Sequence, residues 1–268
     1  MVFIKAIMLA VVEGFTEFLP ISSTGHLILL DRLVQLTADK AFTDAFIVMI
    51  QLPAILSVVL YFWKDLWPFH RDASERRARF GLWLKIFLAF LPAAVLGALF
   101  DDFLEAHLFN PGTVAVTLLV GGIALIVLEQ RPRPAGFASA RDIPAPTAFF
   151  IGLIQCLAMI PGTSRSAATI IGAMLLGSSR VAAAEFSFFL AIPTMAGATA
   201  YTVAKRGLHF DALQWAVLGV GSVVSFLTAL AVIAALMRFV QRHNFTVFGW
   251  YRVALALIVI WYFFLMQA

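Results

Sequence analysis

The chain has 268 residues, of which 62% are hydrophobic and 13% are charged, and its mean hydropathy is +0.95. A soluble globular protein carries roughly twice that share of charge, so the composition excludes a water-soluble domain. At about 20 residues per helical span, the length suits roughly six to eight crossings of a membrane. The net charge of +4 comes from short segments between apolar runs, which disfavours a nucleic-acid partner.

Uncharged apolar runs predict the spans. In chain order they lie at 45–63, 86–100, 113–128, 143–164, 186–204, 212–237 and 253–268. Some runs are slightly short of a bilayer, and we expect flanking residues such as Lys85 and Arg252 to extend them by reaching the interface with their long side chains. The sequence therefore predicts an all-α polytopic membrane protein that forms a single integral membrane domain over 1–268.

Charge placement predicts the orientation of these spans. The stretches 64–85 and 129–142 are rich in arginine and should be cytoplasmic loops by the positive-inside rule. If both stretches are cytoplasmic, the two ends of segment 1–30 lie on the same side of the membrane, and so do the two ends of segment 143–179. Each of these segments is therefore predicted to be a re-entrant helical hairpin. About six transmembrane helices remain. The acidic residues that mark the outer side are Asp101, Asp102 and Glu105.

The two predicted hairpins resemble each other. Glu13 to His26 reads EGFTEFLPISSTGH, and Gln155 to Thr169 reads QCLAMIPGTSRSAAT. Aligning Pro20 with Pro161 brings the hydroxyl-rich segments of both hairpins into register. Chance similarity between two apolar stretches is the alternative explanation.

This alignment predicts an internal repeat with halves at about 1–130 and 143–268. It places Ser23 opposite Ser164. Each half would hold one hairpin and three spans, and an odd number of spans inverts the second half relative to the first. Inverted-topology repeats bring broken helices and polar groups together near the midplane of the membrane.

Carboxylates precede the first predicted break. Glu13 and Glu17 are four residues apart, so on a helix both project from one face. Adjacent carboxylates repel each other, and a divalent cation or a proton must neutralise the pair. Mg²⁺ and Ca²⁺ prefer oxygen ligands and bind between carboxylates and phosphate. We therefore expect Glu13 and Glu17 to bind a divalent cation; a proton-sharing pair near the outer interface is the alternative.

Hydroxyl groups follow the first break. Pro20 disfavours helical geometry at its own position and at the residue before it. The hydroxyls that come next can cap a helix, whose exposed amides bind anions. With His26 and the two carboxylates nearby, they also supply a nucleophile with acid and base groups. Capping alone, and an interfacial role for His26, are the alternatives. The hydroxyl residues are Ser22, Ser23 and Thr24.

The second hairpin supplies a cation. Arg165 is the single charged residue of 143–179. Its guanidinium can hold phosphate through a fixed fork of donors, whereas an arginine reaching to the interface is the alternative. The two hairpin tips together offer the groups expected around a phosphoryl group. The residues expected to bind substrate are Ser22, Thr24, Gly162, Ser164, Ser166 and Thr169.

These two motifs resemble the signature segments of the undecaprenyl-diphosphatase family, also called the bacitracin-resistance or BacA family, and the resemblance covers the whole chain. It implies a bacterial inner-membrane enzyme that hydrolyses undecaprenyl diphosphate to the monophosphate, recycles the lipid carrier of cell-wall synthesis and confers resistance to bacitracin. The family's second motif often has glycine where this chain has Ala167. The family's acidic, serine, histidine and arginine positions fall on Glu13, Glu17, Ser23, His26 and Arg165.

A catalytic hypothesis follows from the resemblance. Ser23 would attack the terminal phosphorus, with Glu17 as base or metal ligand and Arg165 stabilising charge. His26 would protonate the leaving group or assist water, although attack by a metal-bound water or by His26 stays open. We expect polyprenyl diphosphate and membrane lipids as partners, a homodimer, and a site that opens to the periplasm. The alternative function is a lipid-phosphate flippase or transporter that uses the same site, because inverted repeats also build transporters.

Overall fold

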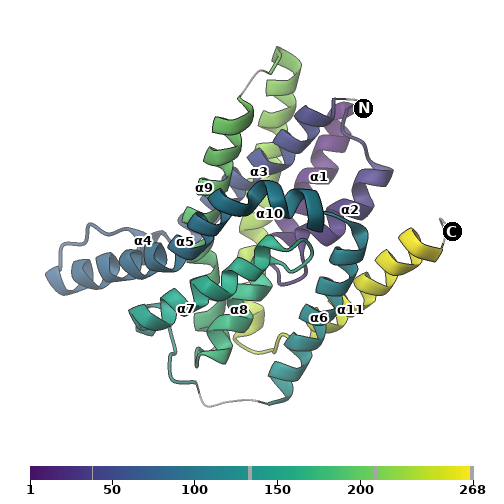
Figure 1. Ribbon diagram of the computed structural model, residues 1–268. Helices are drawn as coiled ribbons and strands as arrows, with labels where there is room; N and C mark the ends of the chain where they lie inside the picture. Colours follow the sequence, from purple (N-terminus) through teal and green to yellow (C-terminus); the bar gives the residue numbers. More distant parts are fainter. Residues whose placement is uncertain (38, 132–134, 208–209, 266–268) are drawn as a thin grey trace.

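The computed structural model describes residues 1–37, 39–131, 135–207 and 210–265 (Figure 1). Every named element over these residues is a helix. Six of the described helices are long and apolar enough to cross a membrane, which confirms the predicted all-α polytopic membrane fold. Their bounds are α3 Lys40–Tyr61, α5 Ala73–Leu108, α6 Pro111–Gln130, α9 Arg180–Arg206, α10 Ala212–Val240 and α11 Thr246–Ile260.

The other helices are too short to span. The apolar segment 143–164, which a hydropathy count would score as one crossing, holds an 11-residue helix that ends before Pro161, against about 20 residues for a span. The hairpin prediction agrees with this break, while the side on which each hairpin enters and leaves stays a prediction. The short helices are α1 Val2–Thr16, α2 Ser23–Leu33, α4 Trp63–Leu66, α7 Ala145–Gln155 and α8 Arg165–Leu175, with single turns at Ala140–Asp142, Cys156–Met159 and Trp261–Leu265.

Polar caps decide where the long helices begin. The capping side chain accepts a hydrogen bond from a backbone N–H of the first turn, which has no partner inside the helix. Asp211, for example, accepts from the Gln214 N–H, and the Gln214 side chain accepts from the Asp211 N–H in return. The caps of α3, α5, α6, α9 and α10 are Asp39, Asp72, Asn110, Ser179 and Asp211.

The predicted loop at 64–85 is mostly helical. α5 begins at Ala73 because Asp72 accepts hydrogen bonds from two N–H groups of the first turn, and only 67–72 is left between α4 and α5. Arg141 binds Asp65 and Glu75 across 2.9 and 3.1 Å. The two arginine-rich segments that the charge rule assigns to one side therefore touch each other. The expected acidic side chains at 101, 102 and 105, and Arg133, lie outside the described part of the chain.

The order of the helices repeats. A broken pair, α1 with α2, precedes α3, α5 and α6, and a second broken pair, α7 with α8, precedes α9, α10 and α11. α1 packs against α10, and α7 packs against α5, so each broken pair lies on a long helix of the other half. Such an exchange is expected of two halves related by a pseudo-two-fold axis. The inversion of the halves relative to the membrane stays a prediction.

The helix caps shift the register of the repeat by one residue. Ser22 caps α2 and accepts from the Gly25 N–H, and Ser164 caps α8 and accepts from the Ala167 N–H, both at 3.2 Å. Both serines have positive φ, 73° and 69°. Ser164 is thus equivalent to Ser22 and not, as the proline alignment predicts, to Ser23. The prolines lie in irregular backbone, whose length is less constrained than a capped helix start.

Aromatic side chains fill the core beside the breaks. Phe18 is fully buried and packs edge-on against Phe188, with ring centroids 5.6 Å apart. Phe62 of the α3–α4 junction contacts Phe188 as well. On the other side of the breaks, α6 and α11 run side by side (Figure 1). The two breaks therefore lie inside the protein, between this aromatic core and the α6–α11 pair.

Candidate functional site

The two breaks meet in space. Ser166, on the first turn of α8, donates from Oγ to the Leu19 carbonyl in the first break at 2.8 Å. Thr117 of α6 donates to the Pro161 carbonyl in the second break at 2.6 Å. Carbonyl groups that leave a helix inside a membrane need such partners, because no water is available there. These hydrogen bonds fix the two breaks against each other and against α6.

A buried arginine that the sequence analysis assigned to the interface joins both breaks. Arg252 is 0% exposed, and its two terminal nitrogens donate to the carbonyls of Pro20 and Gly162 at 3.4 and 3.2 Å. It also donates to the Thr117 and Leu118 carbonyls of α6. The expectation that Arg252 extends a short span is therefore wrong. The second half of α11 supplies enough apolar length, so this arginine is free to point inward.

Two glycines allow the close contacts between α6, Arg252 and the second break. A Cβ at Gly121 of α6 would overlap the guanidinium of Arg252. Gly162 has a φ of +86°, and a Cβ there would overlap Thr117 and the α6 backbone. Only a glycine combines this backbone conformation with such a close approach. Gly162, expected to bind substrate, thus shapes the second break.

A serine, a carboxylate and a guanidinium form a chain at the meeting point. Ser23 donates from Oγ to Glu17 Oε2 at 2.9 Å. The other carboxylate oxygen, Oε1, accepts from Arg165 Nη2 at 3.1 Å. The side chains of Arg165 and Glu17 are 10% and 9% exposed, so little water screens the pair. Three residues that the sequence analysis chose from two distant motifs are therefore in direct contact.

Other contacts hold Arg165 in this position. Its Nη1 donates to the Ser187 carbonyl at 3.0 Å, and the guanidinium lies 5.8 Å from the Phe18 ring centroid. Thr169 donates to the Ser187 hydroxyl at 2.6 Å. Arg165 Nε is buried without a hydrogen-bond partner among the described residues. Thr169 thus fixes the α9 residue that anchors the arginine, and its expected role in substrate binding stays a prediction.

Glu13 is buried beside this chain. Gln51 of α3 donates to Glu13 Oε1 at 3.0 Å, whereas Oε2 is buried and has no partner in the described part of the chain. An orphaned carboxylate oxygen is costly in a protein interior, and a divalent cation would satisfy it. No cluster of three His, Cys, Asp or Glu side chains is present among the described residues. The carboxylate oxygens of Glu13 and Glu17 are suitable ligands for a divalent cation, which they would bind together with oxygen atoms of the substrate.

Two helix N-termini point into the same region. The side chains of Ser22 and Ser164 each satisfy one N–H of the turn that follows, and other first-turn N–H groups of α2 and α8 have no partner within their helices. Ser164 and Ser166 also bind each other through their hydroxyls at 3.0 Å. Thr24 is half-buried in the first turn of α2. N–H groups that a helix leaves unpaired at its start favour an anion nearby.

His26 does not contact the nucleophile candidate. Its Nδ1 lies 2.7 Å from the Ser22 carbonyl, and its Nε2 lies 2.6 Å from the hydroxyl of Tyr251. Both ring nitrogens are engaged, and the carboxylate of Glu17, rather than this imidazole, receives the hydrogen bond of Ser23. The sequence analysis grouped His26 with Ser23 from their spacing of three residues, which places them near each other but does not decide their partners.

Comparison with known proteins identifies the family. The family model for Bacitracin resistance protein BacA matches residues 6–258. The chain belongs to the BacA family. Undecaprenyl-diphosphatase 1 of Clostridioides difficile is 46% identical over 264 residues, which cover 98% of this chain and 96% of that protein.

Other BacA relatives are as similar. The undecaprenyl-diphosphatase of Enterococcus faecalis is 47% identical over 263 residues, covering 96% of this chain and 95% of that protein. That of Fusobacterium nucleatum is 49% identical over 263 residues, covering 95% of this chain and 98% of that protein. The relatives thus extend over both hairpins and all six long helices.

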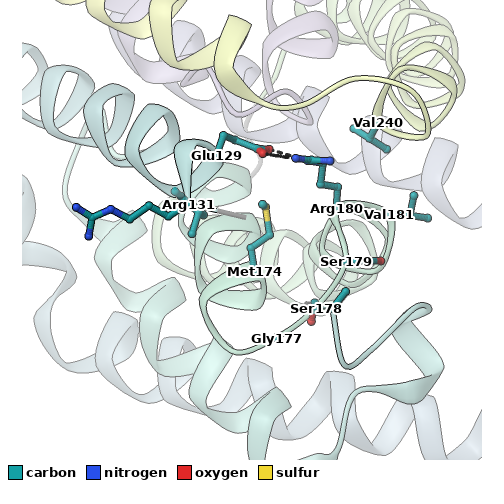
Figure 2. Close-up of a pocket in the computed structure, with 11 residues that line it drawn as sticks. Glu129, Arg131, Met174, Gly177, Ser178, Ser179, Arg180, Val181 and Val240 are labelled. Carbon is teal, nitrogen blue, oxygen red and sulfur yellow. Dashed lines mark hydrogen bonds and ion pairs between the residues drawn. The ribbon is translucent and has the colours of Figure 1, made fainter. Parts of the chain in front are cut away.

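A cavity at the far end of α6 is separate from the BacA motifs. Figure 2 shows this cavity, of about 280 Å³, beside the ion pair of Glu129 and Arg180, with Arg131 pointing away from it. Glu129 accepts from Arg180 Nε and Nη2 at 2.9 and 2.6 Å and from the Phe245 N–H at 2.9 Å. Glu129 follows Thr117 by twelve residues on α6, or about 18 Å along a helix. The pair ties α6, α9 and the turn before α11 together, away from the breaks.

The sequence analysis missed several residues of this site. Arg252, like Arg165, is a charged residue next to apolar sequence, but its position directly before the apolar run 253–268 favoured the interface. Gln51 was visible as a polar residue within a span. No pattern in the sequence distinguishes the other contacts from ordinary apolar helix residues, and only packing reveals them. They are Thr117, Ser187 and Tyr251.

Proposed function

We propose that this chain is an undecaprenyl-diphosphate phosphatase of the bacterial inner membrane, and that its catalytic centre is the meeting point of the two breaks. The contact that carries the proposal is Ser23 with Glu17 at 2.9 Å, held by Arg165 at 3.1 Å. A hydroxyl bound to a carboxylate base is an activated nucleophile. The names of the relatives supply the substrate, and they favour hydrolysis over lipid transport.

In the first step, Ser23 Oγ attacks the terminal phosphorus of the lipid diphosphate. The new bond joins Oγ to that phosphorus, and the bond between the phosphorus and the bridging oxygen breaks. Glu17 takes the hydroxyl proton through the hydrogen bond that it accepts from Ser23. The lipid monophosphate leaves with the bridging oxygen, and the terminal phosphate stays on Ser23.

In the second step, water attacks the phosphorus of the phosphoserine. Glu17, now protonated, is no longer needed as a hydrogen-bond acceptor for Ser23, and it returns its proton to Oγ as the phosphorus–Oγ bond breaks. Inorganic phosphate is released, and one water is consumed overall. Protons therefore balance between Ser23, Glu17 and water alone.

Arg165 and the two helix ends stabilise the negative charge of the transferring phosphoryl group. The guanidinium keeps one buried donor free, and the first turns of α2 and α8 offer further N–H groups. Hydrogen bonds that involve Ser187, Ser166 and Arg252 hold these donors in place before substrate binds. Preorganised donors in a dry site are usually the largest single contribution to catalysis of this kind.

A divalent cation, Mg²⁺ or Ca²⁺, completes the proposed site. Glu13 would hold it through the oxygen that lacks a partner, with Glu17 as the second carboxylate. Bound there, such a cation neutralises phosphate oxygens and the carboxylate pair. We expect chelation to abolish activity, and either cation to restore it.

The test is release of inorganic phosphate by the purified protein in detergent, from undecaprenyl diphosphate with added Mg²⁺ or Ca²⁺. Ser23→Ala should lower kcat by at least about 1,000-fold, because the nucleophile is lost. Ser74→Ala, an exposed serine beside the α5 cap, is the matched control and should turn over like the wild type. Near-normal turnover by Ser23→Ala would exclude the covalent serine route.

The proposed site opens toward the periplasm. Thr117, which binds the second break, lies six residues after the start of α6, or about 9 Å along the helix. The charge rule assigns this start of α6 to the outer side. The breaks are therefore closer to the outer surface. A homodimer stays a prediction.

A further inference from the structure

His26 and Tyr251 form a contact that the proposed mechanism does not use. His26 Nε2 lies 2.6 Å from the Tyr251 hydroxyl, and the two rings stack with centroids 5.5 Å apart and an interplanar angle of 13°. Tyr251 is 45% exposed, so a ligand can reach its hydroxyl. It precedes Arg252 on α11, the helix that joins the two breaks.

The second ring nitrogen fixes the direction of this hydrogen bond. Nδ1 of His26 lies 2.7 Å from the Ser22 carbonyl, and a carbonyl can only accept, so Nδ1 carries the proton. Nε2 of the neutral imidazole then has a lone pair and accepts from Tyr251. The tyrosine hydroxyl is therefore the donor of the pair. Because Ser22 caps α2 at the break, His26 ties Tyr251 to the geometry of the break.

The pair lies one helical turn from the nucleophile. His26 follows Ser23 by three residues on α2, which places their Cβ atoms roughly 5–6 Å apart on one side of the helix. A diphosphate whose terminal phosphorus is at Ser23 carries its second phosphate beside the first. Ser23 donates to Glu17, which also binds Arg165 of α8, and the second phosphate would lie on the His26 side of Ser23.

We propose that Tyr251 binds the phosphate that stays on the lipid. Its hydroxyl proton turns from His26 Nε2 to an oxygen of this phosphate, while the ring stack holds the phenol in place. Tyr251 is then a substrate-binding residue, and His26 is the residue that positions it. This inference rests on the proposed function, because it assumes a lipid diphosphate at Ser23.

Tyr251→Phe removes the hydroxyl and keeps the stacked ring. It should raise KM for undecaprenyl diphosphate and Ki for undecaprenyl phosphate about tenfold each, the effect of one hydrogen bond to a charged group. It should lower kcat less than it raises KM, because most of the contact is already made in the bound substrate. Inhibition by inorganic phosphate should not change. Tyr201→Phe on α9, another half-exposed tyrosine, is the matched control for loss of a phenol hydroxyl.

A double-mutant cycle tests the role of His26. If His26 acts by positioning Tyr251, then Tyr251→Phe has little further effect on Ki for undecaprenyl phosphate in a His26→Ala background. Additive effects of the two substitutions would show that His26 does not position Tyr251. A merely structural role for the tyrosine would change inhibition by both phosphates together.

Two further outcomes would overturn the proposal: wild-type Ki values in Tyr251→Phe, or an equal rise in Ki for inorganic phosphate. Failure of the proposal for Tyr251 can be distinguished from failure of the proposed phosphatase function. Direct binding of undecaprenyl phosphate to the purified protein reports on Tyr251 even if the wild type releases no phosphate, whereas only the absence of turnover in the wild type counts against the phosphatase.

Discussion

Arg165 and Arg252 are both buried, but they bind different kinds of partner. Arg165 pairs with a carboxylate, Glu17, and its buried Nε has no partner among the described residues. Arg252 binds backbone carbonyls of three segments. Burial of an arginine is costly unless every donor finds an acceptor. In both cases the cost is offset by contacts that hold a helix break in place.

Arg165→Lys should lower kcat/KM at least about 100-fold while leaving the melting temperature nearly unchanged. The planar guanidinium contacts Glu17 and the Ser187 carbonyl from two different nitrogens, and a single ammonium cannot reach both. Phosphate release and thermal melting in detergent, measured on one preparation, check this. Arg71→Lys, an exposed arginine before α5, is the control. Wild-type kcat/KM in Arg165→Lys would contradict a role that depends on the guanidinium fork.

Arg252→Met should instead reduce stability, by roughly 2–4 kcal/mol, because carbonyls of both breaks lose their donors. We expect the melting temperature and activity to fall together. Arg242→Met, at an exposed arginine of the preceding turn, should change neither. A variant of Arg252 that is stable but inactive would show that the arginine acts on the substrate and not on the breaks.

In both broken helix pairs, the second helix begins directly after a serine whose backbone conformation is strained. Ser22 and Ser164 have φ values of 73° and 69°, a region that costs a residue with a side chain roughly 1–2 kcal/mol. Each serine offsets part of this cost by capping the helix that follows. This conformation orients the backbone N–H groups at the starts of α2 and α8.

Substitution of Ser22 by glycine and by alanine separates these two effects. Ser22→Ala should lose about 1 kcal/mol, since it keeps the strain and loses the cap. Ser22→Gly should melt no lower than the wild type, because relief of strain compensates for the cap. At Ser179, a cap with an ordinary φ of −63°, both substitutions should destabilise α9. Equal melting of the two Ser22 variants would contradict a strained backbone at this cap.

At the scale of the whole molecule, the two halves exchange their broken helices. α1 packs on α10 and α7 packs on α5, and each half contributes one tip to the site. Ser23 of the first half and Arg165 of the second are equivalent first residues of their helices. Ser23 and Arg165 therefore come to the site from matching helix starts, one in each half of the chain.

Cysteine labelling of intact cells checks the predicted orientation. In a Cys156→Ser background, a cysteine at Asn110 or Phe3 should react with an impermeant maleimide from outside. A cysteine at Arg71 or His243 should react only after the inner membrane is permeabilised. Labelling of residue 3 from the cytoplasm alone would contradict the entry of the first hairpin from the outer side.

The membrane fold and the positions of the two breaks follow from local properties of the sequence, and so do the polar groups that lie at the breaks. Apolar length, proline and isolated charge are local properties, and Glu13, Glu17, Ser23 and Arg165 stand out for the same reason: polar groups inside apolar sequence must find partners.

Only the tertiary structure decided which partners they find. The register of the repeat, the inward turn of Arg252 and the engagement of His26 by Tyr251 depend on contacts between residues far apart in the chain. Spacing along one helix fixes which side chains share a face, but packing between helices decides which atoms meet. The nearness of Ser23 to Glu17 was predictable from a single motif, whereas the groups around this contact come from α3, α6, α8, α9 and α11.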